Sequence, residues 1–275
     1  MIAKRTSSHS LSNSNGHLND LLEFDGHYCD FGFPVGHAVT TFEFLSATLP
    51  RISSSKLDLR SSKLDEVIRS FAKVFDAEQD EIDTAKLLKA CRAHLELMRS
   101  GGSALCLVAK DLESNLLKVE SLYKKSPMEC KTLTSLLELE RESNIHNGNM
   151  LHDPSASMGL LWIRRSLAFQ SHFFQSLVSS DGQPPKDAAY EAYNEHLWPY
   201  HGWMLRTVFP ASLSQMPHRE VFLSKFGEVD MEELDHVTVH KICKKLMALV
   251  TTLEPLLMYW KGSFLKLNLE DERRV

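Results

Sequence analysis

The segment SALCLVAKDLESNLLKVESLYKK, at residues 103–125, carries the pattern that decides the fold class. Its apolar residues recur every three or four positions, the spacing of one helix face: Leu105, Val108, Leu112, Leu116 and Val119. Asp111, Asn115 and Lys118 follow the same spacing and therefore share a second face. At about 100° per residue, this polar row borders the apolar stripe and does not oppose it. The segment predicts a helix with polar groups at the edge of a core.

This polar row is a candidate binding site for a sugar. An acid, an amide and an amine supply hydrogen-bond acceptors and donors together, and sugar hydroxyls require both. A solvated helix face with a ladder of the same three side chains explains the spacing equally well. The pattern by itself leaves both interpretations open.

Helical spacing continues through the rest of the chain, from Leu64 onward, and glycines and prolines lie between the segments. Alternating β patterns are scarce. We expect one all-α domain of about eight helices at residues 64–275. Helical spacing occurs in the segments 64–78, 82–99, 103–125, 127–143, 154–179, 186–197, 199–214, 218–226 and 231–261. Residues 1–63, which are rich in Ser and Asn at first and then irregular, are expected to form a largely disordered extension.

Two helix starts are predicted from local signals. Ser126 and Pro127, with Glu129 three residues after the serine, have the form of a capping box with proline at the first helical position. Asp153 and Pro154 repeat the combination of a capping residue and proline.

The composition limits the possible partners. A net charge of −5 and a pI near 6.2 argue against nucleic acid, because phosphate binding needs a basic face. No apolar run is long enough to cross a bilayer, and residues 1–16 lack the apolar core of a secretory signal. Five scattered cysteines indicate free thiols in a reducing compartment. We expect a cytoplasmic protein with peripheral, reversible membrane contact.

Motifs for catalysis or metal binding do not occur in the sequence. HExxH, GxSxG, the Walker loop and the dinucleotide motif are all missing. His236 and His240 have the i, i+4 spacing of a metal pair, but no third ligand is near in sequence, so solvated histidines are the favoured interpretation. We expect no metal, no cofactor and no enzymatic activity.

Aromatic residues mark two further segments. Met158, Trp162 and Arg165 share one helix face, and a tryptophan at a pocket mouth can stack on a sugar ring. The run WPYHGW at 198–203 crowds two tryptophans, a tyrosine and a histidine at a helix start. Tryptophan and tyrosine are favoured at membrane interfaces. A core tryptophan and a satisfied core histidine remain the alternatives for Trp162 and His201.

In this order, the segments resemble the glycolipid transfer protein family. The resemblance covers roughly residues 82–268 and rests on DLESNLLK at 111–118, the helix from Ser126 to LLELERE at 136–142, LWIRRSL at 161–167, and AY at 192–193 followed by YHGW at 200–203. It implies a two-layer sandwich of helices that encloses a lipid tunnel. It also implies a carrier that binds one glycosphingolipid and moves it between membranes.

The resemblance also implies roles for individual residues. Asp111 is expected to accept hydrogen bonds from the ceramide amide N–H and a sugar hydroxyl, and Asn115 and Lys118 to bond further hydroxyls. Trp162 is expected to stack under the first sugar ring. His201 is expected to donate to the ceramide amide carbonyl. Each of these roles gives a hydrogen-bond partner to a polar group of the lipid that loses its contact with water on binding.

The headgroup class depends on two positions. Family members that resemble ceramide-1-phosphate carriers place basic residues where this chain has Met158 and Trp162, because phosphate needs charge-assisted donors. A neutral sugar is therefore expected here. Lys118 and Arg165 leave some positive charge, so a ceramide-1-phosphate carrier is the alternative. Trp203 is expected to touch the membrane surface.

Other functions remain open. A sphingolipid sensor would bind the same ligand and report it to a protein with little transfer. A hydrolase using His201 and Asp111 would need a nucleophile that the sequence does not display. Glu43–Ala47 and Phe75–Ala77 loosely resemble a short motif that binds endoplasmic-reticulum tethers. The N-terminal extension, Asn194 and the charged end at 268–275 depart from the family pattern.

Overall fold

The computed structural model describes residues 61–76, 80–179 and 183–275, so the expectations for residues 1–60, including the motif at 43–47, lie outside it. The expected all-α class is confirmed. The described residues form nine α-helices and a short hairpin: α2 Lys63–Phe71, β1 Phe75–Asp76, β2 Glu81–Ile82, α3 Thr84–Ser100, α4 Cys106–Lys125, α5 Leu133–Glu142, α6 Ala156–Ser179, α7 Pro185–His196, α8 Trp203–Leu213, α9 Arg219–Gly227 and α10 His236–Lys266. The placement of one domain at 64–275 stays a prediction.

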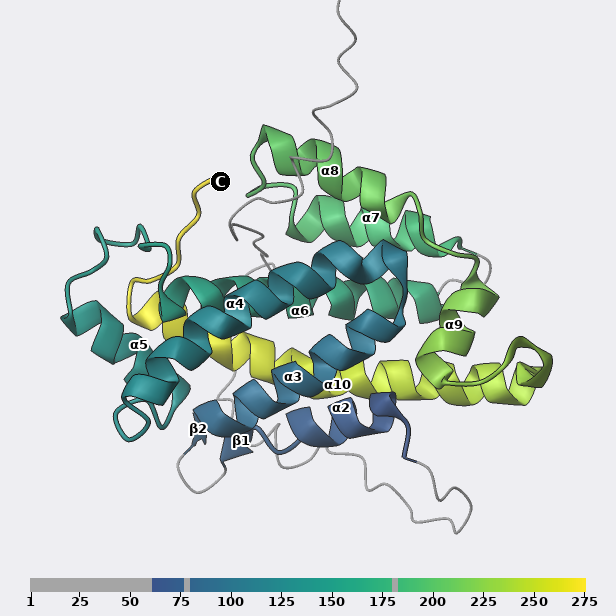
Figure 1. The fold of residues 1–275 in the computed structure, drawn as a ribbon, viewed down its shortest axis with the longest axis horizontal. Coiled ribbons are helices and arrows are strands. Elements are labelled where there is room, and N and C mark those ends of the chain that lie inside the picture. The colour runs from purple at the N-terminus through teal and green to yellow at the C-terminus, as the bar shows by residue number, and fades with distance from the viewer. Residues whose placement is uncertain (1–60, 77–79, 180–182) are drawn as a thin grey trace, which may run out of the picture.

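The helices form two layers (Figure 1). Helices α2, α3 and α4 lie side by side in front, and α6 and α10 pair behind them. Helix α4 packs on α6, and α2 packs on α10. Helix α6 is also in contact with α5 and α7, so it is the central element of the sandwich.

Helix α6 is central because its sequence is apolar on nearly every side. All residues from Ala156 to Ser171 are buried, as expected of a helix without a wide polar face. Its far end contributes to an aromatic cluster with α9, formed by Phe169, Phe173, Phe174, Phe222 and Phe226. Apolar side chains fill the space between the layers. The lipid tunnel therefore stays a prediction, and acyl chains would have to displace some of these side chains.

The first predicted helix, 64–78, is too long. Helix α2 ends at Phe71, and Phe75 pairs with Ile82 in the hairpin. The backbone N–H of Asp83 donates to the carbonyl of Val74, and the Phe75 ring packs on Tyr259. Phe75 and Asp76 are thus engaged in the fold, which disfavours the tethering motif there, while Ala77 lies outside the described residues.

The predicted helix start at Ser126 is wrong. Ser126 ends α4, and α5 begins at Leu133 behind a capping box formed by Thr132 and Ser135. The cause is a long-range backbone contact, because Thr84 N–H donates to the carbonyl of Lys131 at 3.0 Å. A tertiary contact therefore prevents helix formation at residues where local signals favoured a helix.

The cap predicted at Asp153 is also wrong. Helix α6 begins at Ala156, and its first N–H groups donate to the Glu140 carboxylate from α5, at 2.8 Å from Ala156 and 2.6 Å from Ser157. Ser155 Oγ accepts from Met158 N–H. A buried carboxylate at a helix N-terminus satisfies its unpaired donors and its dipole. Asp153 is left for another role.

The last two shifts are smaller. Helix α8 begins at Trp203 and not at 199, and α10 begins at His236 behind the Asp235 cap and extends to Lys266.

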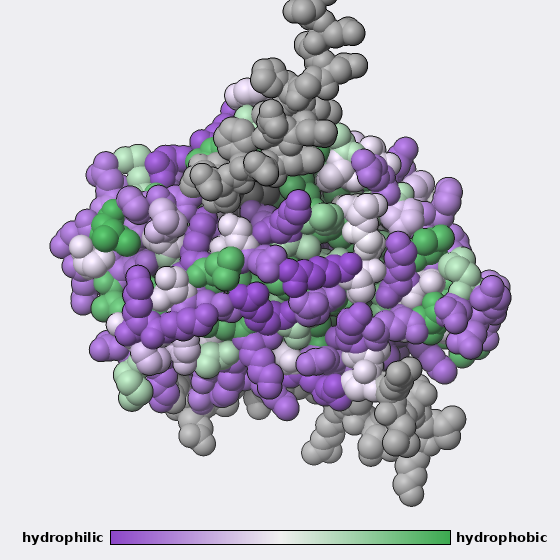
Figure 2. Space-filling view, viewed as in Figure 1, coloured by the Kyte–Doolittle hydropathy of each residue, from purple (hydrophilic) through white to green (hydrophobic). Residues whose placement is uncertain are grey.

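On the face seen in Figure 2, hydrophilic residues dominate and hydrophobic ones are scattered. Within the described ranges, no helix has both the length and the apolar character needed to span a bilayer.

Candidate functional site

The polar row on α4 lies at the edge of the core, where the periodicity predicted it. Asn115 is 1% exposed, and its Nδ2 donates to the carbonyl and the carboxylate of Asp111. Its Oδ1 is buried and has no hydrogen-bond partner among the described residues. An unpaired buried acceptor costs about 1–3 kcal/mol. A donor from a ligand, such as a hydroxyl, would remove this cost.

Lys118, the third residue of the polar row, forms an ion pair with Asp153, which the sequence had predicted to be a helix cap. Lys118 Nζ lies 2.9 Å from Asp153 Oδ1, and both side chains are nearly buried. Asp153 therefore positions the ammonium group instead of capping α6. Burial lowers the pKa of Lys118, and the nearby charge of Asp111 opposes that shift.

A glycine brings α6 against this row. A Cβ on Gly159 would lie 2.6 Å from the Asn115 carbonyl oxygen and 3.2 Å from Lys118 Cβ. Only a residue without a side chain allows the two backbones to approach this closely. Met158 precedes Gly159 and Trp162 follows it by one helical turn, so both belong to the part of α6 that approaches α4.

The α6 face of the site is closed in this structure. The Trp162 indole N–H donates to Met158 Sδ at 2.8 Å, and the two residues are 1% and 3% exposed. The Arg165 guanidinium lies 5.3 Å from the Trp162 ring centroid and 4.9 Å from that of Tyr200. The expected position of Trp162 at an open pocket mouth is therefore not seen. Its stacking on a sugar stays a prediction and requires neighbouring groups to move.

His201 is fully buried, and its Nδ1 lies 3.0 Å from the Tyr193 hydroxyl. Burial and the charge of Arg206 lower its pKa to about 3, so the ring is neutral at physiological pH. If Tyr193 donates to Nδ1, the ring proton is on Nε2, the tautomer that can donate to an amide carbonyl. The geometry is compatible with the expected role.

The aromatic run at 198–203 divides into two parts. Trp203 is 79% exposed and Trp198 is 40% exposed. Tyr200 is half-buried and stacks on Arg165, so it is not part of an exposed patch. The exposure of Trp203 shows that its side chain is not part of the core. Arg206 lies over the Trp198 ring and donates to the Trp198 carbonyl.

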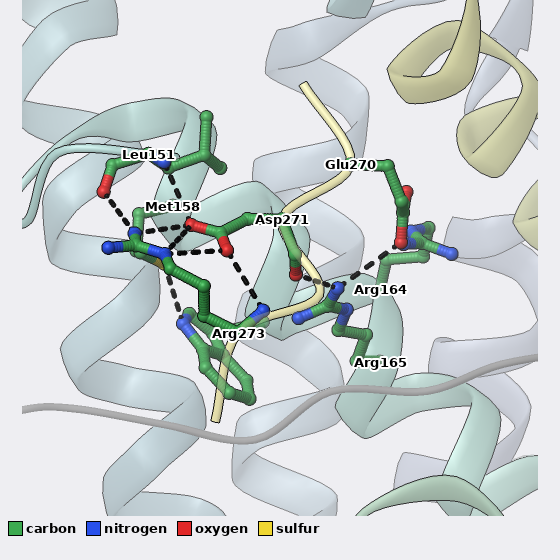
Figure 3. Close-up of polar contacts among 8 residues, drawn as sticks. Leu151, Met158, Arg164, Arg165, Glu270, Asp271 and Arg273 are labelled. Carbon is green, nitrogen blue, oxygen red and sulfur yellow. Dashed lines mark hydrogen bonds and ion pairs between the residues drawn. The ribbon is translucent and has the colours of Figure 1, made fainter. Parts of the chain in front are cut away.

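The sequence did not predict that the residues after α10 pack on α6 beside the site. Residues after α10 run back across α6, and Glu270 pairs with Arg164 at 2.6 Å and with Arg165 at 3.2 Å (Figure 3). Arg165 also donates to the Asp271 carbonyl. The charged composition of 268–275 was the only signal for this arrangement, and it indicated no partner.

Two histidines lie together at a place that no sequence pattern indicated. His236 and His240 are both exposed. In contrast, His172 Nδ1 lies 2.7 Å from His196 Nε2, and Glu195 lies within 3.7 Å of both rings. This is the group with metal-ligand chemistry among the described residues. The two nitrogens have the spacing of a hydrogen bond, which accounts for the contact without an ion.

The acid of the row has an unusual pKa that predicts pH-dependent stability. Burial raises the pKa of Asp111 from 3.8 to about 7, and Lys118 and Asn115 oppose the shift. The folded protein thus holds the proton more tightly than the unfolded chain, so stability falls as pH rises from about 4 to 7. Asp111→Asn removes this loss. The free energy of unfolding of this variant, relative to wild type, should rise by about 1–3 kcal/mol between pH 4 and 7. This is less than the full pKa shift would give, because the Asp111 side chain is partly exposed to solvent.

Urea unfolding of both proteins at pH 4.5, 6 and 7.5 measures this difference. A gap that stays constant with pH would assign Asp111 an ordinary pKa.

Comparison with known proteins agrees with this geometry. The family model for glycolipid transfer protein matches residues 82–228. Glycolipid transfer protein A of Xenopus laevis is 32% identical over 197 residues, which span 66% of this chain and 88% of that protein. The chain belongs to the glycolipid transfer protein family. This family consists of lipid transfer proteins.

One further relative and two solved structures are also similar to this chain. Glycolipid transfer protein 1 of Arabidopsis thaliana is 29% identical over 161 residues, covering 57% of this chain and 78% of its own length. Mouse ceramide-1-phosphate transfer protein superposes with a TM-score of 0.67 at 20% identity, over 76% of this chain and 98% of that one. The GLTP fold of FAPP2, described as selecting simple glycosphingolipids, gives 0.66 at 24% identity, over 78% and 100%. These structures show the fold and do not decide the headgroup.

Proposed function

We propose that this protein binds one glycosphingolipid and transfers it between membranes. The observation that supports the proposal most strongly is the polar row of Asp111, Asn115 and Lys118, which α6 approaches closely at Gly159, in the fold of a lipid transfer family. The buried, unpaired Oδ1 of Asn115 favours a ligand that donates hydrogen bonds.

Different residues of the candidate site bind different parts of the ligand. Asp111, Asn115 and Lys118 bind the sugar hydroxyls, and Asp111 also accepts from the ceramide amide N–H. Trp162 supplies a flat apolar surface for the sugar ring, since aromatic faces match the apolar face of a sugar. His201 donates to the amide carbonyl. Met158 and Arg165 support the Trp162 ring from two sides.

The acyl chains enter between the two helical layers. Each buried CH₂ group contributes about 0.8 kcal/mol. The chains would replace apolar side-chain contacts with contacts of the same kind, so the cost of opening the layers is partly offset.

Membrane contact is peripheral in this proposal. Trp203 projects at the start of α8 and inserts shallowly into the interface, which lets the protein leave again with its cargo. We place this activity at the cytoplasmic faces of membranes.

The proposal predicts a headgroup preference that a transfer assay measures. Labelled glucosylceramide should move between vesicles faster with the protein than without it, and unlabelled galactosylceramide should compete better than ceramide-1-phosphate. Met158 and Trp162 are apolar where a phosphate needs charged donors, which is the physical reason. Binding without acceleration would favour a sphingolipid sensor. Altered lipid products after incubation would favour an enzyme.

A double substitution sharpens the same prediction. Met158→Arg with Trp162→Arg should shift preference toward ceramide-1-phosphate. Both residues are buried, so the variant's melting temperature must be recorded with its binding. Wild type that already prefers the phosphate lipid would contradict the reading of these two positions.

A further inference from the structure

The chain after α10 is hydrogen-bonded to the loop before α6 and to the turn before α8. The Asp271 carboxylate accepts from the Leu151 backbone N–H at 2.8 Å, and Arg273 donates to the Leu151 carbonyl at 3.0 Å (Figure 3). Val275 N–H donates to the Tyr200 carbonyl at 3.0 Å. We call residues 267–275 the C-terminal strap. Its path crosses α6 between the loop before that helix and the turn before α8 (Figure 1).

The strap brings a carboxylate to two buried cations. Arg164 and Arg165 are 2% and 1% exposed, and Glu270 lies between them with Oε1 at 2.6 Å and 3.2 Å from their Nη2 atoms. Burial lowers the pKa of Arg165 to about 9, and Glu270 opposes that shift. Glu270 is therefore the principal charge partner of the pair.

The arginine pair lies within reach of a headgroup. Arg165 contacts the face of Trp162, the ring proposed to lie under the sugar. The other cations near the site have carboxylates too, since Asp153 pairs with Lys118 and Asp271 pairs with Arg273. Lys261 and Glu272 add one charge of each sign at longer range. The site is thus close to neutral while it contains several cations.

We infer that Glu270 is a specificity-determining residue, which excludes phosphate headgroups by occupying the Arg164–Arg165 pair with its own carboxylate. This inference rests on the proposed function. Carboxylate and phosphate both use the planar guanidinium fork, so they compete for the same donors. The strap holds Glu270 in place, which gives it the high effective concentration of a tethered partner.

Neutral and charged headgroups meet this arrangement differently. A phosphate would have to displace Glu270 or lie beside it in a poorly screened, water-poor site, where like charges repel strongly. A neutral sugar brings no charge and can bind while the ion pairs stay intact. Selectivity for a sugar therefore depends on the strap as well as on Met158 and Trp162.

The test compares full-length wild type with Glu270→Gln and the matched control Glu272→Gln. Glu272 is exposed and two residues away on the strap, so its change removes the same charge without freeing the arginines. Glucosylceramide and ceramide-1-phosphate with identical acyl chains compete for a fluorescent lipid. Glu270→Gln should bind ceramide-1-phosphate about tenfold more tightly than wild type, as expected for about one charge-assisted hydrogen bond. Its affinity for glucosylceramide, and both affinities of Glu272→Gln, should stay within about threefold.

A second variant covers the case in which Glu270→Gln does not fold. Arg164→Gln with Glu270→Gln removes the shorter of the two Glu270 ion pairs as a unit and leaves Arg165 hydrogen-bonded to the Asp271 carbonyl. It should also gain affinity for ceramide-1-phosphate, and this lipid should raise its melting temperature.

The outcomes separate the two proposals. Wild type that binds glucosylceramide, with no gain for ceramide-1-phosphate in either Glu270 variant, overturns the inference and leaves the proposed function standing. An equal gain in Glu272→Gln, or wild type that binds both lipids equally, also overturns it. Wild type that binds neither lipid overturns the proposed function itself.

Discussion

Replacing Asp111 with valine is expected to abolish glycosphingolipid transfer while the protein stays folded. In the proposed binding mode, the variant would lose two hydrogen bonds to the ligand and would leave the ceramide amide N–H unpaired in a dry site. A loss of about 3 kcal/mol or more corresponds to at least about a hundredfold weaker binding. Stability should not fall, because burial already disfavours the charge of this carboxyl, as its pKa of about 7 indicates.

The measurement combines transfer and thermal unfolding on the same sample. Glu113→Val is the matched control, because Glu113 is a partly exposed carboxylate on the same helix that pairs with Arg99 instead of facing the site. Its transfer rate should match wild type. A folded Asp111→Val protein that transfers lipid at the wild-type rate would remove Asp111 from the site.

Trp203→Ala is expected to weaken vesicle binding and slow transfer while leaving the pocket intact. The side chain is 79% exposed at the first residue of α8, so its removal opens no cavity and should change stability by no more than about 0.5 kcal/mol. Loss of one shallow aromatic anchor should lower vesicle affinity about tenfold. Lipid binding from detergent should persist.

Salt and fluorescence distinguish aromatic docking from charge attraction. With a net charge of −5, the protein is only weakly attracted to anionic lipids, so aromatic contact should dominate membrane binding. Binding to neutral vesicles should therefore depend weakly on salt. Trp162 and Trp260 are buried, so a blue shift on adding vesicles reports Trp198 and Trp203. Trp203→Phe should reduce that shift. An unchanged shift combined with a strongly lowered melting temperature would contradict the docking role.

The sequence alone determined the helices and one edge of the site. Hydrophobic spacing of three and four residues fixes which face of each helix is buried, because that spacing is a property of the helix itself. For the same reason, the row of Asp111, Asn115 and Lys118 could be placed beside the core from α4 alone. The length and sharpness of this local pattern also made the family resemblance visible.

Helix starts were less predictable, because several capping signals compete along one chain. Ser126 has every local feature of a cap, yet the backbone contact between Thr84 and Lys131 moves the start of α5 to Leu133. Asp153 likewise lost its cap role to Glu140, which comes from a different helix. A distant partner decides such cases, and local propensity differs too little between neighbouring positions to resist it.

Only the tertiary structure decided what surrounds the candidate site. Glu270 lies 106 positions after Arg164, and no periodic pattern relates residues so far apart. Their pairing depends on the path of α10 and on where the strap turns back over α6. Trp162 and Trp203 show the same division. The sequence identified both as notable tryptophans, but Trp162 is buried against Met158 and Arg165, whereas Trp203 is exposed at the start of α8.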